Sequence, residues 1–264
     1  MNEAELLFTK VLNCDRVSLY LDRDLSLSAQ EANFISRVLK RRIQHEPLQY
    51  ILGEADFMGF KVAVNPSVLI PRPETEILVE TAGKYLSEVI KLKAKARVLD
   101  LGTGSGCIAI ALAKYFPQAD ILACDISREA LKVAAQNTSL QGVRVDLREG
   151  DLFDACILAN DAFDLIVSNP PYIANKDFTT LQPEISYEPR IALDGGEDGL
   201  VFYRRIAAGG RRYLKDGGYL ILEIGIDQAL PIKEILDQEG SLKIKEVIRD
   251  YNNIERVIVV DKKG

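Results

Sequence analysis

The spacing of hydrophobic residues predicts helices in the first part of the chain. Apolar residues recur three and four positions apart up to about residue 48, as on helices with one buried face. These positions are Leu6, Leu7, Val11 and Leu12, followed by Phe34, Ile35, Val38, Leu39 and Ile43. Ser28 and Glu31 have capping-box spacing before the second helix, and Glu46-Pro47 predicts its end. We therefore expect residues 1–48 to form a small all-α domain.

The pattern changes between residues 50 and 70. Two short apolar runs, at 50–53 and 60–64, lie on either side of Met58-Gly59, and Asn65-Pro66 follows the second run. Turn residues between two short apolar runs are typical of a hairpin. Residues 49–70 are therefore predicted to be a β-hairpin linker.

Beyond residue 71, predicted strands alternate with predicted helices. Strands are expected at 97–101, 120–125, 143–149, 165–168, 219–224, 242–250 and 256–261. Helices are expected to begin near Glu74, Gly106, Arg128, Leu200 and Gln228. This alternation indicates the α/β class, with a parallel sheet covered by helices on both faces.

The last two predicted strands differ from the others. Only Tyr251-Asn252-Asn253 separates them, which is too short for a helical crossover, so they must be antiparallel neighbours. Residues 71–264 are therefore predicted to form a seven-stranded, mostly parallel, Rossmann-like sheet with an antiparallel last strand. A dinucleotide-binding Rossmann domain normally ends with another parallel unit instead.

Composition and charge restrict the class of protein. The 264 residues are 47% hydrophobic and 27% charged, as in globular proteins, and no apolar run approaches the roughly 18 residues of a membrane span. Met1-Asn2-Glu3-Ala4-Glu5 carries acids where a secretory signal carries bases, so we expect a cytoplasmic protein. A net charge of −6 disfavours a protein that holds long nucleic acid through its phosphates.

The cysteines and the single histidine do not predict a metal or disulfide site. Cys14, Cys107, Cys124 and Cys156 include no C-x-x-C pair, and His45 is the only histidine. Cys107 and Cys124 lie in apolar stretches and are expected to be small buried hydrophobes. His45 is expected at the surface or between the domains, without a catalytic role.

The most informative motif is Asn169-Pro170-Pro171-Tyr172, which follows the apolar run at 163–168. Its prolines fix φ and keep the preceding residues out of the helical region, so the carbonyls of Asn169 and Pro170 are held rigid. A planar NH2 group could donate to the Asn169 side-chain oxygen and to the Pro170 carbonyl while it stacks on Tyr172. The motif therefore predicts binding of a planar nitrogen, and an amide, adenine and guanine all remain open.

A glycine-rich turn follows the predicted strand at 97–101. Its residues are Gly102, Thr103, Gly104, Ser105 and Gly106. Glycines permit a tight turn and a close approach of backbone to a ligand, and free N–H groups at a helix start attract a polar or anionic group. The spacing lacks the extra residue of the dinucleotide pattern G-x-G-x-x-G, and a purely structural turn stays an alternative.

Acidic residues follow the next two strands. Asp125 lies about 20 residues beyond the glycines, where a carboxylate can accept both hydroxyls of a ribose. A helix cap is the alternative, although Ser127 competes for that role. Asp151 could accept from an adenine amino group while Leu152 or Phe153 covers the ring, or it could be an ordinary turn residue.

In this order the glycine turn, the two acids and the Asn-Pro-Pro-Tyr motif resemble a class I S-adenosylmethionine-dependent methyltransferase over residues 72–261. Three further segments narrow the resemblance: Ile-Pro-Arg-Pro-Glu-Thr-Glu at 70–76, Tyr-Glu-Pro at 187–189, and 192–200. With the helical domain, they are similar to the peptide chain release factor glutamine N5-methyltransferases, the PrmC/HemK family. This resemblance covers essentially the whole chain.

The resemblance implies methyl transfer from S-adenosyl-L-methionine to the side-chain nitrogen N5 of a glutamine. That glutamine belongs to the Gly-Gly-Gln motif of bacterial class I peptide chain release factors, so the reaction would modulate translation termination. S-adenosyl-L-homocysteine would be the second product. The implied protein is a monomer that binds neither a membrane nor, stably, nucleic acid, and its residues 1–48 would recognise the release factor.

The resemblance also implies a role for each candidate residue. Asn169 and Pro170 would hold the amide, Pro171 would make the corner rigid, and Tyr172 would stack on the amide. The cofactor would be bound by Gly102, Thr103, Gly104, Ser105, Gly106, Asp125, Asp151, Leu152 and Asn169. Leu152 departs from the family members that carry an aromatic residue there.

Several charged residues have two interpretations. Arg72, Glu74 and Glu76 could close the site over cofactor or substrate, with Arg72 and Glu74 as substrate-binding candidates, or they could simply begin a helix at Pro73. Lys40-Arg41-Arg42 and Arg211-Arg212 could meet an acidic partner or RNA, or could be solvated faces.

Two other functions stay open. Adenine N6 and guanine N2 methyltransferases also use Asn-Pro-Pro-aromatic corners to hold the amine of a flipped base, but they must grip nucleic acid, which the acidic balance disfavours. A non-catalytic nucleotide-binding or NAD-dependent protein would bind its cofactor without methyl transfer.

Overall fold

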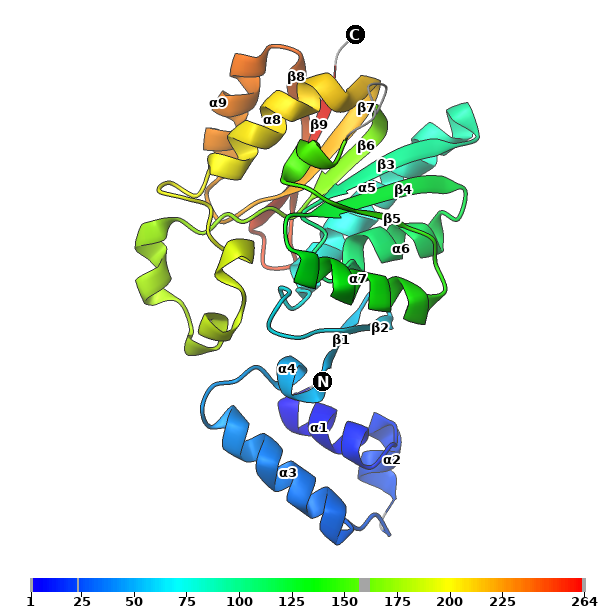
Figure 1. Cartoon of the computed structure of the whole chain (residues 1–264), viewed down its shortest axis with the longest axis vertical. Coiled ribbons are helices and arrows are strands. Elements are labelled where there is room, and N and C mark those ends of the chain that lie inside the picture. Colours follow the sequence, from blue (N-terminus) through cyan, green and yellow to red (C-terminus); the bar gives the residue numbers. More distant parts are fainter. Residues whose placement is uncertain (1, 23, 157–161, 263–264) are drawn as a thin grey trace.

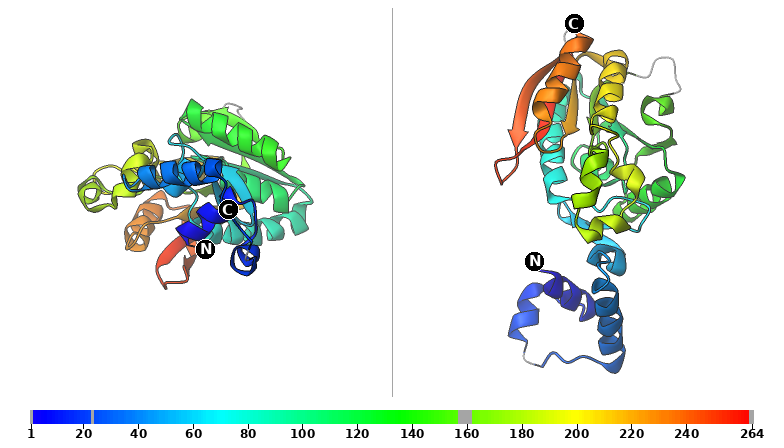
Figure 2. Two further views of the ribbon diagram at one scale, coloured as in Figure 1. Left: turned by 90° about the horizontal axis from the view of Figure 1, so that it is seen from below. Right: turned by 90° about the vertical axis from the view of Figure 1, so that its left-hand side faces the viewer.

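The computed structural model describes residues 2–22, 24–156 and 162–262. Met1 and residues 263–264, at the outer ends of the predicted domains, lie outside these ranges. A small helical part lies below a larger α/β body in Figure 1. The side view in Figure 2 shows that the helical part extends away from the body. The molecule is therefore elongated.

Helices form the N-terminal part of the chain. They are α1 (Glu3–Val11), α2 (Arg16–Leu21), α3 (Ala29–Arg42) and α4 (Leu48–Leu52). The predicted capping box of α3 is confirmed, because Ser28 and Glu31 accept from each other's backbone N–H groups. Helix α2, which Asp15 caps, was missed from the sequence. Helices α1, α3 and α4 share a small buried core of Leu7, Ile35, Val38 and Leu48.

The hairpin is present, but its first strand was predicted in the wrong place. Strand β1 (Glu54–Phe57) pairs antiparallel with β2 (Phe60–Ala63) around Met58-Gly59. Residues 50–52, predicted as a strand, belong to α4, which Pro47 precedes and Gly53 ends with a left-handed φ of 76°. So short an apolar run does not distinguish a strand from a helical turn.

The body is built from a sheet and the helices that cover it. Its strands are β3 (Ala96–Leu101), β4 (Ala119–Asp125), β5 (Asp146–Glu149), β6 (Phe163–Ser168), β7 (Leu214–Glu223), β8 (Leu242–Arg249) and β9 (Glu255–Lys262). Its α-helices are α5 (Pro73–Lys93), α6 (Cys107–Tyr115), α7 (Arg128–Gln141), α8 (Val201–Tyr213) and α9 (Ala229–Glu239). Short 3₁₀ helices are η1 (Leu152–Ala155), η2 (Asn175–Thr180), η3 (Pro183–Tyr187) and η4 (Arg190–Ala192).

The sheet confirms the predicted fold class. Its seven strands among the described residues have the order β5-β4-β3-β6-β7-β9-β8, and β9 is antiparallel to both of its neighbours. The pairings among β3, β4, β5, β6 and β7 are parallel. Strand β5 begins three residues later than the predicted start at 143, and β7 begins five residues before the predicted start at 219.

Helices cover both faces of the sheet. Alternate strand residues such as Val98 and Leu165 pack with α5, α6 and α7 in one apolar cluster. Their neighbours Leu99 and Ile166 pack with α8 and α9 in another. Both layers are visible in Figure 1. Burial on both faces explains why these strands are apolar without interruption.

The order of the strands determines where a ligand can bind. From β3 the chain proceeds outward to β4 and β5, then returns to the other side of β3 as β6. The crevice at such a reversal, outside the carboxyl ends of the strands, is the usual ligand site of an open α/β sheet. The glycine turn and the Asn-Pro-Pro-Tyr motif follow the two strands that flank this crevice, β3 and β6.

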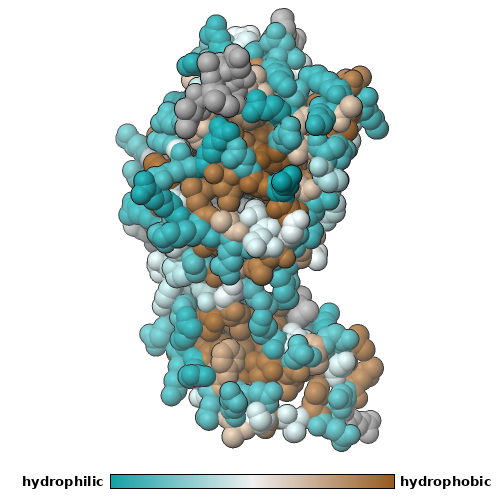
Figure 3. All heavy atoms as spheres, turned by 45° about the vertical axis from the view of Figure 1, so that its right-hand side comes forward, coloured by the Kyte–Doolittle hydropathy of each residue, from teal (hydrophilic) through white to brown (hydrophobic). Residues whose placement is uncertain are grey.

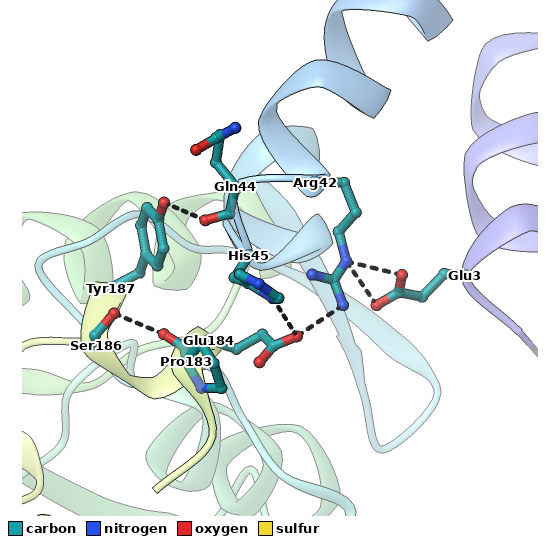
Figure 4. Close-up of polar contacts among 8 residues, drawn as sticks. All are labelled: Glu3, Arg42, Gln44, His45, Pro183, Glu184, Ser186 and Tyr187. Atoms are coloured by element: carbon teal, nitrogen blue, oxygen red, sulfur yellow. Dashed lines mark hydrogen bonds and ion pairs between the residues drawn. The ribbon is translucent and has the colours of Figure 1, made fainter. Parts of the chain in front are cut away.

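A segment between β6 and α8, which we call the strap (residues 173–200), connects the body with the helical part. Figure 4 shows Arg42 of α3 between Glu184 of the strap, at 3.0 Å, and Glu3 of α1, at 2.9 Å. The Tyr187 hydroxyl donates to the Gln44 carbonyl at 2.6 Å. Arg42 therefore connects the helical part with the strap and is not simply part of a solvated face.

A buried asparagine connects the hairpin with the glycine turn. Asn137 of α7 accepts from the Ala63 N–H at 2.7 Å and donates to the carbonyls of Ala63 and Ser105, both at 2.9 Å. Its side chain is fully buried. These bonds hold three segments that are far apart in the sequence.

We expect Asn137→Ala to lower the free energy of unfolding by about 2–4 kcal/mol, because it leaves the buried Ser105 carbonyl and the partly buried N–H and carbonyl of Ala63 without this partner. Urea denaturation measures the change. The exposed Gln136→Ala on the same helix is the matched control. A loss no larger than that of the control would contradict the prediction.

Candidate active site

A cavity lies at the carboxyl ends of β3, β4, β5 and β6, at the predicted crevice. Its wall brings together most of the candidate residues. These are Gly102, Thr103, Gly104, Ser105, Asp125, Asp151, Leu152, Asn169, Pro170 and Pro171. Gly106, Tyr172, Arg72 and Glu74 do not belong to this wall. The cavity joins residues as far apart in the sequence as Ser67 and Arg205.

The glycine turn divides into an open part and a packed part. Gly104 has a φ of 55°, and a Cβ atom there would meet open space, so backbone is exposed to the cavity. Gly106 has a φ of 82° and begins α6, but a Cβ atom there would lie 3.2 Å from Cβ of Ala134 on α7. Gly104 therefore leaves room for a ligand, whereas Gly106 permits helix packing.

Asp125 holds the glycine turn from the end of β4. Its Oδ2 accepts from the Gly104 N–H at 2.8 Å, and its Oδ1 accepts from the Ser127 N–H at 2.9 Å. Burial raises the pKa of Asp125, while these backbone donors act in the opposite direction. Ser127 is the residue that caps α7. Each Asp125 oxygen retains a second lone pair, so the carboxylate can also accept from a ligand.

The residues after β5 form the opposite wall. Asp151 pairs with Arg205 of α8 at 2.8 Å, and Leu152 lines the cavity with a φ of 53°. Phe153 turns away and stacks on Tyr213, with 5.1 Å between the ring centres. Of the two residues considered as a cover for the adenine, only Leu152 therefore faces the cavity. Arg205 lines the cavity as well and was missed from the sequence.

The Asn-Pro-Pro-Tyr corner contributes its first three residues to the cavity. The Asn169 Nδ2 donates to the Thr75 hydroxyl at 3.2 Å. Tyr172 packs instead with the cluster under α8 and α9, and its carbonyl accepts from Gln228 at 3.0 Å. Burial raises the pKa of Tyr172 to about 12, so its hydroxyl stays neutral. Stacking of Tyr172 on a substrate amide stays a prediction.

Thr75 and Glu223 extend this corner into the protein. The Thr75 hydroxyl donates to Glu223 Oε2 at 2.7 Å, and both side chains are buried. Burial raises the pKa of Glu223 to about 7, against the opposing effects of Thr75, Arg256 and Asn169. Sequence reasoning missed both roles. The signal was available, because Thr75 lies within the segment 70–76 and Glu223 ends the strand beside β6.

The residues at the start of α5 bear out the helix-start interpretation, whereas closure of the site over cofactor or substrate stays a prediction. Helix α5 begins at Pro73, with Glu74 and Glu76 in its first turn. Glu76 accepts from the Met58 N–H of the hairpin turn at 2.6 Å. Arg72 forms an ion pair with the buried Glu188 of the strap. The segment is thus a helix start that also holds the hairpin and the strap.

The sequence of this chain is similar to those of known protein families. The PrmC N-terminal domain family matches residues 1–53, and the methyltransferase small domain family matches residues 76–206. The release factor glutamine methyltransferase of Geobacter sulfurreducens is 45% identical over 97% of this chain and 87% of that protein. The chain belongs to the release factor glutamine methyltransferase family.

Solved structures share the fold of this family member at lower identity. A methyltransferase from Pyrococcus furiosus is 19% identical, with a TM-score of 0.57 over 88% of this chain and all of that chain. The 16S rRNA N2 G1207 methyltransferase of T. thermophilus, solved with AdoMet and guanosine, is 17% identical. It has a TM-score of 0.54 and covers 80% of this chain and half of that chain. The fold is therefore that of a methyltransferase.

The remaining observations concern potential metal ligands, long apolar helices, Cys107 and His45. No group of three or more potential metal ligands occurs among residues 2–22, 24–156 and 162–262. Within the same ranges, no helix is both long and apolar enough to cross a membrane. Burial raises the pKa of the Cys107 thiol to about 12, so Cys107 is a buried hydrophobe as predicted. His45 lies beside Glu184 at the strap, outside the cavity wall.

The pKa of Glu223 predicts a pH dependence of stability. It is about 7 in the folded protein and about 4.5 without burial, so the folded state binds more protons between these values. The contribution of Glu223 to stability is therefore fully present below pH 4.5 and is lost as the pH rises towards 7.

Glu223→Gln should remove this dependence. Relative to the wild type, the variant should gain up to about 1.4 kcal/mol of unfolding free energy for each pH unit between 4.5 and 7. Urea denaturation of both proteins across this range measures the difference. Stability curves that run parallel would contradict the assigned pKa.

Proposed function

We propose that this protein transfers the methyl group of S-adenosyl-L-methionine to the side-chain nitrogen N5 of a glutamine. The glutamine is that of the Gly-Gly-Gln motif in bacterial class I peptide chain release factors, and its methylation modulates translation termination. The observation that carries the proposal is the position of Asn169, which is fixed at the cavity wall in a chain closely related to release factor glutamine methyltransferases.

The cavity residues fit the proposed cofactor. Gly102 and Gly104 leave open space where Cβ atoms would stand, so backbone N–H groups can meet the polar groups of the ligand. Asp125 has acceptors for the ribose hydroxyls, and Leu152 offers an apolar contact for the adenine. S-adenosyl-L-methionine supplies an electrophilic methyl group when it is bound, with S-adenosyl-L-homocysteine as the proposed product.

The corner provides what a poor nucleophile needs. An amide nitrogen is weakly nucleophilic because its lone pair is delocalised. The Asn169 Oδ1 and the Pro170 carbonyl can accept both of its hydrogens, which favours a more pyramidal and electron-rich nitrogen. The prolines keep these two acceptors rigid, so binding also orients the nitrogen. Pro171 makes the corner rigid, and Tyr172 is proposed to stack on the amide.

We also propose that residues 1–48 recognise the release factor, with 49–70 as a linker and 71–264 as the catalytic domain. The helical part has its own small core, yet it exposes large apolar side chains, which appear brown in the lower half of Figure 3. Leu39 is 50% exposed, and Ile43 is 72% exposed. Exposed apolar groups on one small domain favour a protein partner.

The same proposal includes the cellular setting. Release factors act in the cytoplasm, so the protein is proposed to work there. With a net charge of −6, it is expected to hold no nucleic acid stably. It is proposed to act as a monomer. Salt-sensitive binding of RNA or DNA would favour the alternative function as a base methyltransferase.

Asn169→Ala tests the amide grip. We expect the variant to keep binding S-adenosyl-L-methionine through the eight other candidate residues, but to lose at least about 10²-fold in methyl transfer, because the acceptor for the substrate amide is gone. Transfer of a radiolabelled methyl group to a purified release factor measures the rate, and calorimetry measures cofactor binding. A release factor with Gln→Ala in its Gly-Gly-Gln motif is the substrate control. Full activity of Asn169→Ala would refute the model.

The double substitution Leu39→Ser, Ile43→Ser tests the recognition role of the helical domain. We expect KM for the release factor to rise about tenfold with little change in kcat, because apolar contacts to the partner are lost. The matched control is Leu92→Ser, since Leu92 is 83% exposed on α5 of the body. An unchanged KM in the double variant would argue against this role.

A further inference from the structure

The Asn169 side chain is the outer member of a row of three hydrogen-bonded groups. Asn169 Nδ2 donates to the Thr75 hydroxyl at 3.2 Å, and the Thr75 hydroxyl donates to Glu223 Oε2 at 2.7 Å. Thr75 is 3% exposed and Glu223 1% exposed, so solvent competes little for either bond. Asn169 lies in the corner after β6, Thr75 lies on α5, and Glu223 is the last residue of β7.

We propose that Thr75 and Glu223 are positioning residues that fix which end of the Asn169 amide faces the substrate. An asparagine amide has nearly the same shape when it is rotated by 180°, but its donor and acceptor are then exchanged. Only the orientation with Oδ1 towards the cavity can accept from a substrate NH2 group. This inference rests on the proposed function, because it assumes that Asn169 accepts from the substrate amide.

The direction of the hydrogen bonds follows from the chemistry of the three groups. An ionised carboxylate only accepts, so the single hydroxyl proton of Thr75 must go to Glu223. The Thr75 oxygen can then only accept, and the group that donates to it must be Asn169 Nδ2. The carboxylate, which does not line the cavity, thereby points the Asn169 oxygen towards it.

Protonation of Glu223 removes this constraint. A neutral carboxyl can donate to Thr75, which can then donate to Asn169 Oδ1 and turn the amide around. Burial raises the pKa of Glu223 to about 7, within the range of an activity assay. The other charged or titratable groups that face Glu223 are Glu74 of α5, Cys107 of α6, Tyr172 of the corner, Tyr203 of α8 and Arg256 of β9. The hydroxyl of Tyr203 is already committed to the Glu223 carbonyl, at 3.0 Å.

Variants of Thr75 test the role of the hydroxyl. Thr75→Val removes it at nearly constant volume, whereas Thr75→Ser keeps it. We expect kcat for release factor methylation to fall at least about tenfold in Thr75→Val, the equivalent of one lost hydrogen bond, and to stay near the wild-type value in Thr75→Ser. Thr75 also lines the cavity, so any loss of cofactor affinity in Thr75→Val should be smaller than the loss of kcat. Thr81→Val is the matched control, because Thr81 is also buried on α5.

Two results would overturn the proposal. One is a wild-type kcat in Thr75→Val. The other is an equal loss in Thr75→Ser and Thr75→Val, which would mean that the hydroxyl is not the group that matters. Thermal unfolding identifies a variant that has lost activity through misfolding. If Thr75→Val is misfolded, the pH profile of Glu223→Gln tests the proposal instead.

The dependence of kcat on pH tests the role of the Glu223 carboxylate. Wild-type kcat should fall on the acid side of about pH 7, and Glu223→Gln should have a lower but pH-independent kcat, since a carboxamide allows both directions of bonding. An acid limb that persists unchanged in Glu223→Gln would refute the role of Glu223.

A nuclear magnetic resonance experiment separates this inference from the proposed function. If the wild type transfers no methyl group to release factors, the proposed function fails. The positioning role is then decided by the side-chain NH2 resonances of Asn169. These should be protected from solvent exchange in the wild type and in Thr75→Ser, but not in Thr75→Val. Equal protection in all three proteins would overturn the inference.

Discussion

A parallel sheet that is covered on both faces has all of its carboxyl ends at one edge, because each helix returns the chain to the opposite edge before the next strand begins. In this protein the constraint brings the glycine turn, Asp125, Asp151 and Asn169 to one cavity. No local sequence pattern predicts that these residues are neighbours in space. Their meeting follows from the order of the strands, with β3 at the reversal.

Two buried carboxyl groups, those of Asp100 and Glu223, also lie at this edge of the sheet. Asp100 lies fully buried below the glycine turn, where burial raises its pKa to about 7 and Thr103 donates to it at 2.7 Å. Glu223 has a similar environment at the end of β7. Ionised groups are unfavourable in such places unless hydrogen bonds compensate them, and perturbed carboxyls of this kind gather at functional sites. The interior under the cavity is therefore organised by polar groups as well as by packing.

The strap gives the distant helical part a physical connection with the cavity. It leaves the body directly after Tyr172, contacts Arg42 through Glu184, and contacts Arg72 through Glu188. Arg72 immediately precedes α5, on which Thr75 lies. Two residues of the strap that are close in sequence, Glu184 and Glu188, thus contact the helical part and the start of α5 respectively.

The sequence by itself determined the fold class, the place of the cavity and ten of the 27 residues that line it. The periods of strands and helices, the glycines and the Asn-Pro-Pro-Tyr motif can all be recognised from short stretches of sequence. An uninterrupted apolar strand is typical of a parallel sheet that is buried on both faces. Local signals failed where segments are short, as at α2 and residues 50–52. Only the tertiary structure decided that Tyr172 packs away from the cavity wall, that Arg205 pairs with Asp151, and that Glu223 reaches Asn169 through Thr75. These contacts join residues 54 to 148 positions apart, and the direction of a side chain depends on neighbours that only folding brings together.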